Sequence, residues 1–378
     1  MSKEAPALTL NKDYSISDKF FQGKYNLTLK ISWKIIKSID ELVTYKSQWQ
    51  KLAKNSPDGF FTSPEWLLEW INVYWQKSWQ LSVIIGTTDD TLSVLAPFYI
   101  QNKKAFGITY KALFPIGQGE VEHAEVASEY QDILISIKHD EIHAKIANQI
   151  KALTYDNLTW RAISKQANLL KISKHLPQAR VNVAGTRYAI YNACSKEVLL
   201  SKNNRYKWNK CKKLLLENNA DFFWCDTDQL QDHWLKLKEI HTQRWRLKNK
   251  SGAFTSADFN IFHQNLIKQG LCKISILKIK GKLAAINYYL IGDNCLYFYQ
   301  SGWKNNYASL SPGFSLHQWS IENNALDCYD FMMGEHQQSY KNSYSCNQIA
   351  DMFTVRQERQ LFKYWLCRLQ KKLALKFN

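Results

Sequence analysis

The sequence lacks the features that mark a metal centre, a membrane span or an exported protein. Its eight cysteines include no C-x-x-C pair and no cluster with histidine at zinc-ligand spacing, so no structural metal is expected. All eight lie in the second half, several in apolar runs, which predicts reduced, buried thiols. No apolar run is long enough to span a membrane, and the N-terminus lacks the apolar core of a signal peptide. We therefore predict a cytoplasmic protein.

Acidic residues are few relative to basic ones. Fifty Lys and Arg against 33 Asp and Glu give a formal charge of +17. Such a surface attracts phosphates on a cofactor, a nucleic acid or an anionic lipid, although a solvated basic face explains the charge equally well. The 378 residues, 45% of them hydrophobic, predict a globular protein of two ordinary domains or one large one.

Strand-like runs recur in the two halves of the chain. Each half has apolar runs joined by short polar turns, which is typical of β-hairpins: Leu81–Gly86, Leu92–Ile100 and Leu113–Ile116, then Lys273–Lys278, Leu283–Ile291 and Cys295–Ser301. This repetition predicts an α/β (α+β) fold of two related halves. Each half is expected to hold a mixed, mostly antiparallel sheet flanked by helices.

Three segments have helical patterns. At the first, Ser63 can cap, Pro64 fits the first turn, and Thr62 with Glu65 offers a capping box. Its aromatic stripe, from Trp66 to Tyr74, is interpreted as core. The second, residues 201–218, is a basic helix for which a solvated face and contact with phosphate or RNA are equal alternatives. The third, residues 358–378, is a basic amphipathic helix that docks on the body or, as the sharper alternative, attaches to the inner-membrane surface.

These patterns divide the chain into four parts. We expect a flexible tail at residues 1–28, an N-terminal half at 29–190, a C-terminal half at 191–357 and the final helix at 358–378.

The C-terminal half contains an ordered set of motifs. They are Leu296–Gly302, Ser311-Pro312-Gly313 before a helix from Phe314 to Asn324, and Tyr329–Glu335. This set resembles the CelD-like acetyltransferase domain of the GNAT (Gcn5-related N-acetyltransferase) superfamily, which is related to the Fem-type tandem GNAT proteins. Weaker similarity extends the resemblance over residues 60–345, through Phe61–Trp66, Ala96–Tyr99, residues 201–205 and His241–Trp245.

The resemblance implies two tandem GNAT-like halves and a bacterial N-acyltransferase. Its donor would be an acyl-CoA, no metal is implied, and its acceptor would be the amino group of a sugar, amino acid or peptide. The family also suggests a role in cell-envelope or polysaccharide biosynthesis. Two alternatives stay open: a Fem-type transferase that uses aminoacyl-tRNA, and a noncatalytic basic adaptor for nucleic acid or membrane. The acyl group, the acceptor and the oligomeric state do not follow from the sequence.

Acyl transfer from a thioester to an amine requires a pyrophosphate site, donors for the oxyanion and a proton acceptor. A helix that begins near Pro312 would direct N–H groups at the pyrophosphate, although the loop Ala308–Gly313 departs from the glycine-rich GNAT pattern. The cofactor-binding candidates are Ser301, Gly302, Lys304, Ser311 and Gly313. The oxyanion donor would be a backbone N–H on a bulged strand in the region Tyr299–Gly302.

Four residues are candidates for acid–base catalysis: His241, Asp330, Glu335 and, as proton donor to the leaving thiolate, Tyr299. Structural roles compete with these, because a helical histidine is more often structural and Asp330 can pair with a cation such as Arg244. The candidates for substrate binding are Arg244, Trp245, Tyr340 and Lys341.

Overall fold

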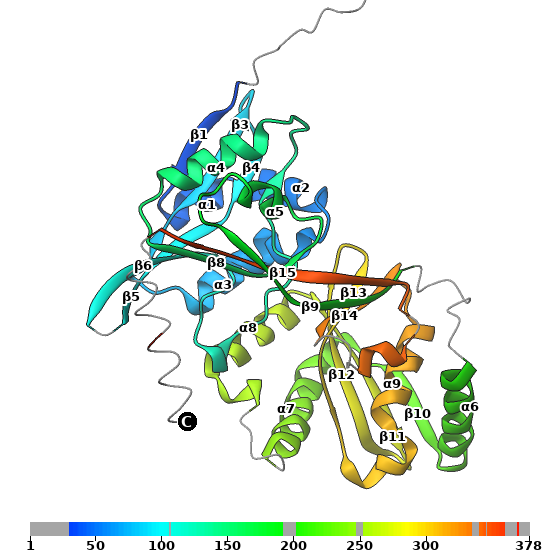
Figure 1. Cartoon of the computed structure of the whole chain (residues 1–378). Helices are drawn as coiled ribbons and strands as arrows, with labels where there is room; N and C mark the ends of the chain where they lie inside the picture. The colour runs from blue at the N-terminus through cyan, green and yellow to red at the C-terminus, as the bar shows by residue number, and fades with distance from the viewer. Residues whose placement is uncertain are drawn as a thin grey trace, which may run out of the picture.

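The computed structural model describes residues 30–105, 107–191, 202–246, 252–334, 340–344, 346–359 and 369 (Figure 1). The predicted tail at 1–28 lies outside these residues, as does the predicted helix at 358–378 apart from Glu358, Arg359 and Leu369. Cys194 and Cys367 also lie outside them, and none of the six described cysteines forms a disulfide. No described helix has the length and apolarity to cross a membrane.

The N-terminal half begins with a strand, continues with three helices and then forms hairpins. Its elements are β1 Ser32–Ile36, α1 Ile39–Thr44, α2 Lys46–Lys54, η1 Gly59–Thr62, α3 Pro64–Tyr74, β2 Gln80–Leu81, β3 Val83–Thr88, β4 Thr91–Ala96, β5 Phe98–Ala105, β6 Ile108–Pro115, η2 Glu122–Ala124, β7 Leu134–Ile135, α4 Ile142–Ala152, β8 Asn157–Ser164, α5 Asn168–Ser173 and β9 Arg180–Tyr191. Pro97 separates β4 from β5, as expected of a residue that cannot donate to a ladder.

The C-terminal half begins with a helix and then follows a similar order of a strand, helices and hairpin strands. Its elements are α6 Lys202–Glu217, β10 Ala220–Trp224, η3 Thr227–Gln229, α7 Leu230–Arg246, η4 Ala253–Thr255, α8 Ala257–Lys268, β11 Cys272–Ile279, β12 Lys282–Gly292, β13 Cys295–Trp303, η5 Asn305–Leu310, α9 Pro312–Glu322, β14 Cys328–Gly334, η6 Tyr340–Ser343 and β15 Gln348–Glu358. The predicted hairpins β3–β4, β11–β12 and β12–β13 and the basic helix, which is α6, are confirmed. The predicted run Leu92–Ile100 is not one strand, because Pro97 divides it into β4 and β5, which belong to different sheets.

The two halves exchange their last strands. Eleven strands form one sheet in the order β10-β11-β12-β13-β14-β9-β15-β8-β6-β5-β2, and β1, β3, β4 and β7 form a second. Strand β9, which ends the N-terminal half, pairs with β14 of the other half, whereas β15 returns to pair with β8. Strands β9 and β15 also pair with each other, so together they join the halves (Figure 1).

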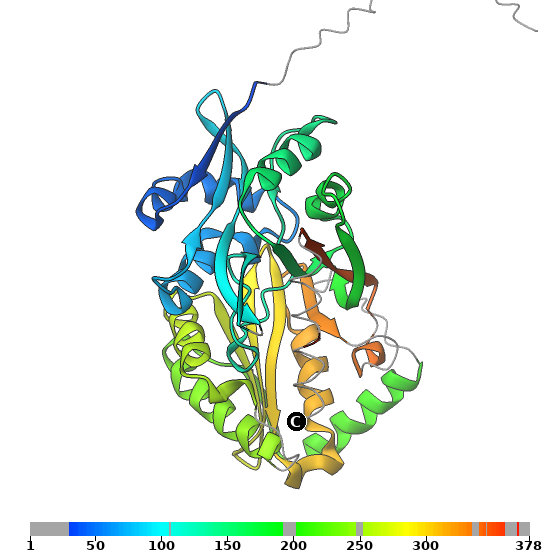
Figure 2. The ribbon, with the colours of Figure 1, turned by 60° about the vertical axis from the view of Figure 1, so that its left-hand side comes forward.

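Helices cover both faces of the C-terminal sheet. Figure 2 shows α7 and α8 on one side of the long strands β12 and β13, and α9 on the other. The alternation of side chains along β12 explains this arrangement, because Ile286 packs in the core beneath α7 and α8 while its neighbour Ala285 packs beneath α6 and α9. The fold is therefore α/β, with sheets flanked by helices in both halves.

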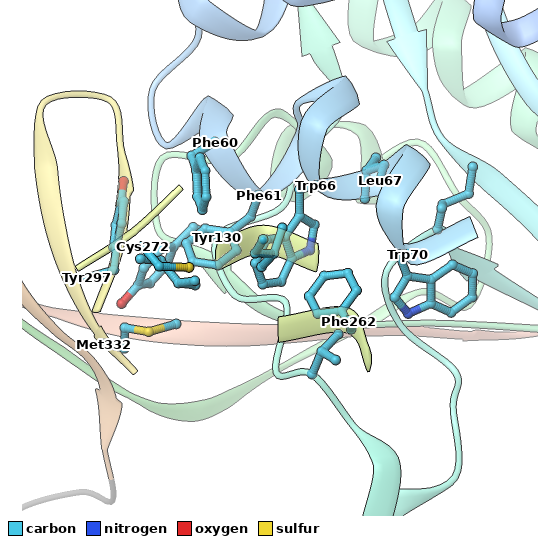
Figure 3. Close-up of a cluster of buried hydrophobic side chains, with 14 of the residues drawn as sticks. Phe60, Phe61, Trp66, Leu67, Trp70, Tyr130, Phe262, Cys272, Tyr297 and Met332 are labelled. Atoms are coloured by element: carbon cyan, nitrogen blue, oxygen red, sulfur yellow. The ribbon is translucent and has the colours of Figure 1, made fainter. Parts of the chain in front are cut away.

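Aromatic side chains of the N-terminal half complete the core on the α8 side (Figure 3). The Trp66 ring lies 4.9 Å from the Phe262 ring of α8, and the Phe60 ring stacks 5.9 Å from that of Tyr297. Trp66 and Trp70 are fully buried, so the interpretation of the helical stripe as core is confirmed. The halves thus share a continuous hydrophobic interior.

The start of α3 corrects one local prediction. Ser63 caps the helix, as predicted, because its hydroxyl accepts the Trp66 N–H at 3.3 Å. The predicted capping box was wrong. The Thr62 hydroxyl accepts the N–H of Asp132, and the Glu65 carboxylate accepts the side-chain amide of Gln50. Both side chains are taken by neighbours that are distant in sequence, which a local pattern cannot reveal.

Candidate functional site

Strand β13 contains a β-bulge at Tyr299. Its neighbour β12 pairs Tyr288 with Gln300 and Tyr289 with Phe298, so Tyr299 is an extra residue without a partner in the ladder. A bulge disrupts the ladder locally and leaves a backbone N–H available to a ligand. In the N-terminal half, β5 and β6 pair without a register shift from Phe98 to Ala105. Of these two described strand pairs, β5–β6 and β12–β13, only β12–β13 has this bulge.

Strands β13 and β14 separate beside the bulge. They pair in parallel at three positions, the last of which is Tyr297 opposite Asp330. Beyond this point, β13 continues to Trp303 and β14 to Gly334 without pairing to each other. We call the place where β13 and β14 separate, next to Tyr297 and Asp330, the junction. Beyond it, the backbone of β13 has no β14 partner.

The connection from β13 to α9 lies beside a small cavity. The cavity, of 330 Å³, is lined by Arg244 and its α7 neighbours Glu239, Ile240 and Gln243 together with Trp303, Lys304, Asn305 and Asn306. We call it the loop cavity. The Arg244 guanidinium lies 4.8 Å from the Trp303 ring centre, so two of the predicted site residues, Arg244 and Lys304, meet here although they come from different elements.

The remaining predicted cofactor residues lie on either side of this connection. Ser311 has a positive φ of 48° and precedes Pro312, the first residue of α9. Gly313 abuts Trp303, because a Cβ on it would lie 3.3 Å from the Trp303 Cδ1. Gly302 packs against α7, where an added Cβ would lie 3.0 Å from Ile240. Ser301 is half-buried opposite Asn287 of β12. Their roles in cofactor binding stay predictions.

A buried ion-pair cluster holds the junction together. The Arg187 guanidinium of β9 donates to Asp330 at 2.7 Å and to Asp58 at 2.9 Å, and its carbon lies 4.1 Å from the Tyr130 ring centre. The suggested pairing of Asp330 with Arg244 was wrong, because Arg187 occupies that place. The Asp330 carboxylate also accepts the Met332 N–H at 2.6 Å, so it fixes the irregular backbone of β14, where Met332 has a positive φ.

The hydrogen bonds of Asp330 also bear on whether a metal ion could bind at this cluster. The thiols of Cys295 and Cys328 and the carboxylate of Asp330 lie within 4.8 Å of one another. Both Asp330 oxygens, however, already accept hydrogen bonds, from Arg187 to one and from Tyr130 and Met332 to the other. Two thiols beside a guanidinium do not supply the four ligands of a structural zinc site. These three residues therefore do not fit a metal centre.

The other predicted catalytic residues differ in their surroundings. His241 is buried on α7 beside the Phe254 ring, and burial lowers its pKa to about 4. The Tyr299 hydroxyl donates to the Val126 carbonyl at 2.6 Å, and burial raises the pKa of Tyr299, which keeps it protonated. Glu335 lies outside the described residues. No result assigns catalysis to any of them, so these roles stay predictions.

The predicted substrate-binding residues other than Arg244 also differ in their surroundings. Lys341 is buried, and its ammonium group donates to the carbonyls of Phe331, Met332 and Met333 at 2.5, 3.1 and 2.6 Å, which indicates a structural contribution. Tyr340 on η6 is 53% exposed and lies beside His317. Trp245 is in α7, but its side chain lies outside the described residues.

Sequence reasoning missed two buried carboxylates of the N-terminal half. Glu129 accepts the Met333 N–H of β14 at 2.7 Å, and burial raises its pKa to about 7. Glu120 accepts the Trp70 indole N–H at 2.9 Å, and burial raises its pKa also to about 7. Both lie in the irregular segment between β6 and β7, where no periodicity marks buried positions.

A larger cavity lies between the halves and reaches the junction. Its volume is 770 Å³, and its wall includes Cys295, Tyr297 and Cys328 from the junction itself. The N-terminal half contributes Asp58, Phe60 and the end of α2, and the turn between β12 and β13 contributes Asp293. We call it the interhalf cavity. It lies within the size range of ordinary ligand sites.

Comparisons with known proteins agree with this arrangement. Residues 202–342 match the model of the acetyltransferase (GNAT) domain. No protein of curated function matches the chain. The crystal structure of FemX is similar over 85% of this chain and 98% of its own, with 10% identity and a TM-score of 0.59. The C-terminal domain of a putative lysylphosphatidylglycerol synthetase from Agrobacterium fabrum is similar over 88% and 96%, with 8% identity and a TM-score of 0.50.

At these identities the two structures establish the fold alone. The enzyme class follows from the matched domain, which contains β13, α9 and β14 and hence the bulge and the junction. The chain is thus an acyltransferase with a fold of two tandem GNAT-like halves, and residues 202–342 of its C-terminal half match the acetyltransferase (GNAT) domain.

Proposed function

We propose that the protein transfers an acyl group from an acyl-CoA, or a similar thioester, to the amino group of a sugar, amino acid or peptide. The observation that carries this proposal is the bulge at Tyr299 next to the separation of β13 and β14, inside the matched domain. A backbone N–H freed there is suited to polarise a thioester carbonyl and to stabilise the oxyanion that forms when an amine attacks it.

The charges around α9 suit the phosphates of such a donor. Arg244 and Lys304 line the loop cavity, and the Lys207 ammonium of α6 lies 4.1 Å from the ring centre of Phe314 in the first turn of α9. The unpaired N–H groups at the start of α9 add partial positive charge. We assign the donor to this side of the junction and the acceptor to the interhalf cavity. Tyr299, protonated at neutral pH, is the proposed proton donor to the leaving thiolate.

A thermal-shift titration with CoA, acetyl-CoA and longer acyl-CoAs tests the donor. Because a ligand that binds only the folded state stabilises it by mass action, a concentration of 100 times Kd should add about 2.7 kcal/mol. Gly313→Trp should abolish this gain, since even a Cβ at that position meets Trp303 at 3.3 Å. Asp140→Trp places the same side chain at an exposed site of the other half and should keep the gain. No shift of the unsubstituted protein with any CoA species would refute the acyl-CoA donor.

The basic helix α6 supports a second candidate donor, aminoacyl-tRNA. Lys202, Arg205, Lys207, Lys210 and Lys213 are all exposed on α6, whose residue Lys207 lies beside the start of α9. If a tRNA binds there, its affinity should fall steeply with salt because each phosphate contact releases counterions. Titration of the same protein with aminoacyl-tRNA at two salt concentrations separates the candidates, since stabilisation by tRNA without any response to CoA species would favour this donor.

A further inference from the structure

The interhalf cavity differs in charge from the rest of the molecule. The chain carries a formal charge of +17, yet the cavity wall holds three carboxylates, Asp58, Glu65 and Asp293, against two cations, Lys54 and Arg187. Arg187 is already shared between Asp58 and the fully buried Asp330. Glu65 and Asp293 then face Lys54, the single remaining cation among the described residues of the wall, so this part of the cavity is acidic within a basic protein.

The rest of the wall is polar and uncharged or apolar. Side-chain amides of Gln50, Gln166, Asn294 and Gln348 line it together with Phe60 and Tyr297. Side-chain amides are uncharged and can both donate and accept hydrogen bonds, and aromatic faces suit sugar rings and methylene chains. A second cavity of 340 Å³ shares Asp58, Gln166, Arg187 and Gln348 with the first and extends over β9 and β15. The space is therefore larger than a single amino group requires.

The position of the cavity relates its charge to the transfer. Cys295, Tyr297 and Cys328 belong both to the wall and to the three-position paired stretch that precedes the separation of β13 and β14, with Cys295 and Cys328 at its start and Tyr297 at its end. An amine in the cavity would thus lie on the side of the junction opposite the cationic loop cavity. Ammonium groups are attracted by Glu65 and Asp293, whereas a phosphate or carboxylate on the same molecule would be repelled by them. Among the described residues of the wall, such an anion would meet only Lys54 and the already paired Arg187 as cations, and in the second cavity Lys165 is accompanied by Asp351.

From these observations we infer that the interhalf cavity selects acceptors that are polar amines without an anionic group, such as amino sugars, amino alcohols or amino acid esters. The inference rests on the proposed function and names the class of its acceptor. Acidic side chains both attract the ammonium form and exclude phosphorylated or carboxylated relatives of the same size, which is how a site obtains specificity through repulsion as well as attraction.

Isothermal titration of the protein without any donor tests this inference at pH 7. The probes are two matched pairs: glucosamine with glucosamine 6-phosphate, and lysine methyl ester with lysine. The member without the anion should bind at least about tenfold more tightly, which corresponds to about 1.4 kcal/mol. Equal or tighter binding of the anionic member would overturn the inference. Failure of both glucosamine and lysine methyl ester to bind in the millimolar range would also overturn it.

Two substitutions show whether the acids of the wall are responsible. Asp293 lies in the turn with a φ of 51° and accepts the Phe60 N–H at 2.7 Å; asparagine tolerates that φ and can accept the same bond, so Asp293→Asn removes little but charge. Asp293→Asn combined with Glu65→Gln should weaken binding of glucosamine about tenfold or more and reduce the preference over its phosphate. Asp140→Asn removes an acid that is exposed outside the cavity and should change neither. Unchanged binding in the double variant would overturn the assignment.

The design separates this inference from the proposed function. Donor binding is measured independently, by the stabilisation that an acyl-CoA produces. Preference for anionic amines in a protein that binds acyl-CoA refutes only the acceptor class. Preference for amines without an anionic group, in a protein that binds no CoA species, refutes only the acyl-CoA donor.

Discussion

Replacement of Arg187 by methionine is expected to lower the free energy of unfolding by about 3 to 5 kcal/mol. Arg187 is the only described cation that pairs with Asp58 or Asp330, and it is 7% exposed in its side chain. Methionine retains much of the volume, so the loss comes from two carboxylates left without their guanidinium partner, Asp330, which is fully buried, and Asp58, which is 13% exposed. Urea unfolding at pH 7 measures the change.

The control for this substitution is Arg161→Met. Arg161 also forms an ion pair, at 2.6 Å with Glu125, but the two side chains are 42% and 28% exposed. Pairs in such surroundings contribute at most about 1 kcal/mol. If the burial argument is right, neutralising the stranded carboxylates with Asp58→Asn and Asp330→Asn should restore part of the stability that Arg187→Met removes. A loss in Arg187→Met no larger than in the control would contradict it.

The stability gained by Glu120→Gln is expected to rise by on the order of 3 kcal/mol between pH 5 and pH 8. Burial raises the pKa of the Glu120 carboxyl from 4.5 to about 7. The folded state therefore binds this proton more tightly than the unfolded chain does. Its contribution is fully present below the unfolded pKa and is lost as the pH rises through 7. Glutamine does not titrate and can still accept the Trp70 indole N–H, so the variant escapes this loss.

The measurement is the difference between variant and parent in urea unfolding at the two pH values. Two buried histidines make the difference more informative than the parent curve alone. Burial lowers the pKa of His263 and of His317 to about 3, so their contribution is lost as the pH falls below 6.5, in the opposite direction to that of Glu120. Glu122→Gln, an exposed change in the same segment, should show no such pH dependence. A pH-independent difference for Glu120→Gln would refute the buried-carboxyl argument.

Much of the fold could be predicted from the sequence because local signals agree with tertiary structure. The hairpins β3–β4 and β12–β13 have polar turns, where Asp89–Asp90 and Asp293–Asn294 adopt the positive φ angles that such residues tolerate. The start of α3 followed from Ser63 and Pro64. The similarity between the halves was visible because the same order of runs occurs twice. These features depend on neighbours in sequence.

The decisive parts of the candidate site depend on distant neighbours instead. Tyr299 ends the apolar run Leu296–Tyr299 of a strand that continues to Trp303, and the residues themselves do not distinguish a bulge from a regular strand; only the family resemblance pointed to a bulge in this region. The sequence around Arg187 in β9 likewise does not reveal its two partners, Asp58 and Asp330, which lie 129 and 143 residues away. The pairing of Asp330 was assigned to the wrong arginine for this reason. Burial of Glu120 and Glu129 is equally invisible, because an irregular segment has no period.

The exchange of β9 and β15 determines when the chain can fold. During synthesis from the N-terminus, β8 has to wait for β15, since Ile163 pairs with Phe353. Until then the first half exposes an open sheet edge, which is a hazard for association with other chains. Pairings of such long sequence separation also slow the search for the native topology. The half is the repeated unit of this sequence, but the smallest cooperative folding unit should be both halves together.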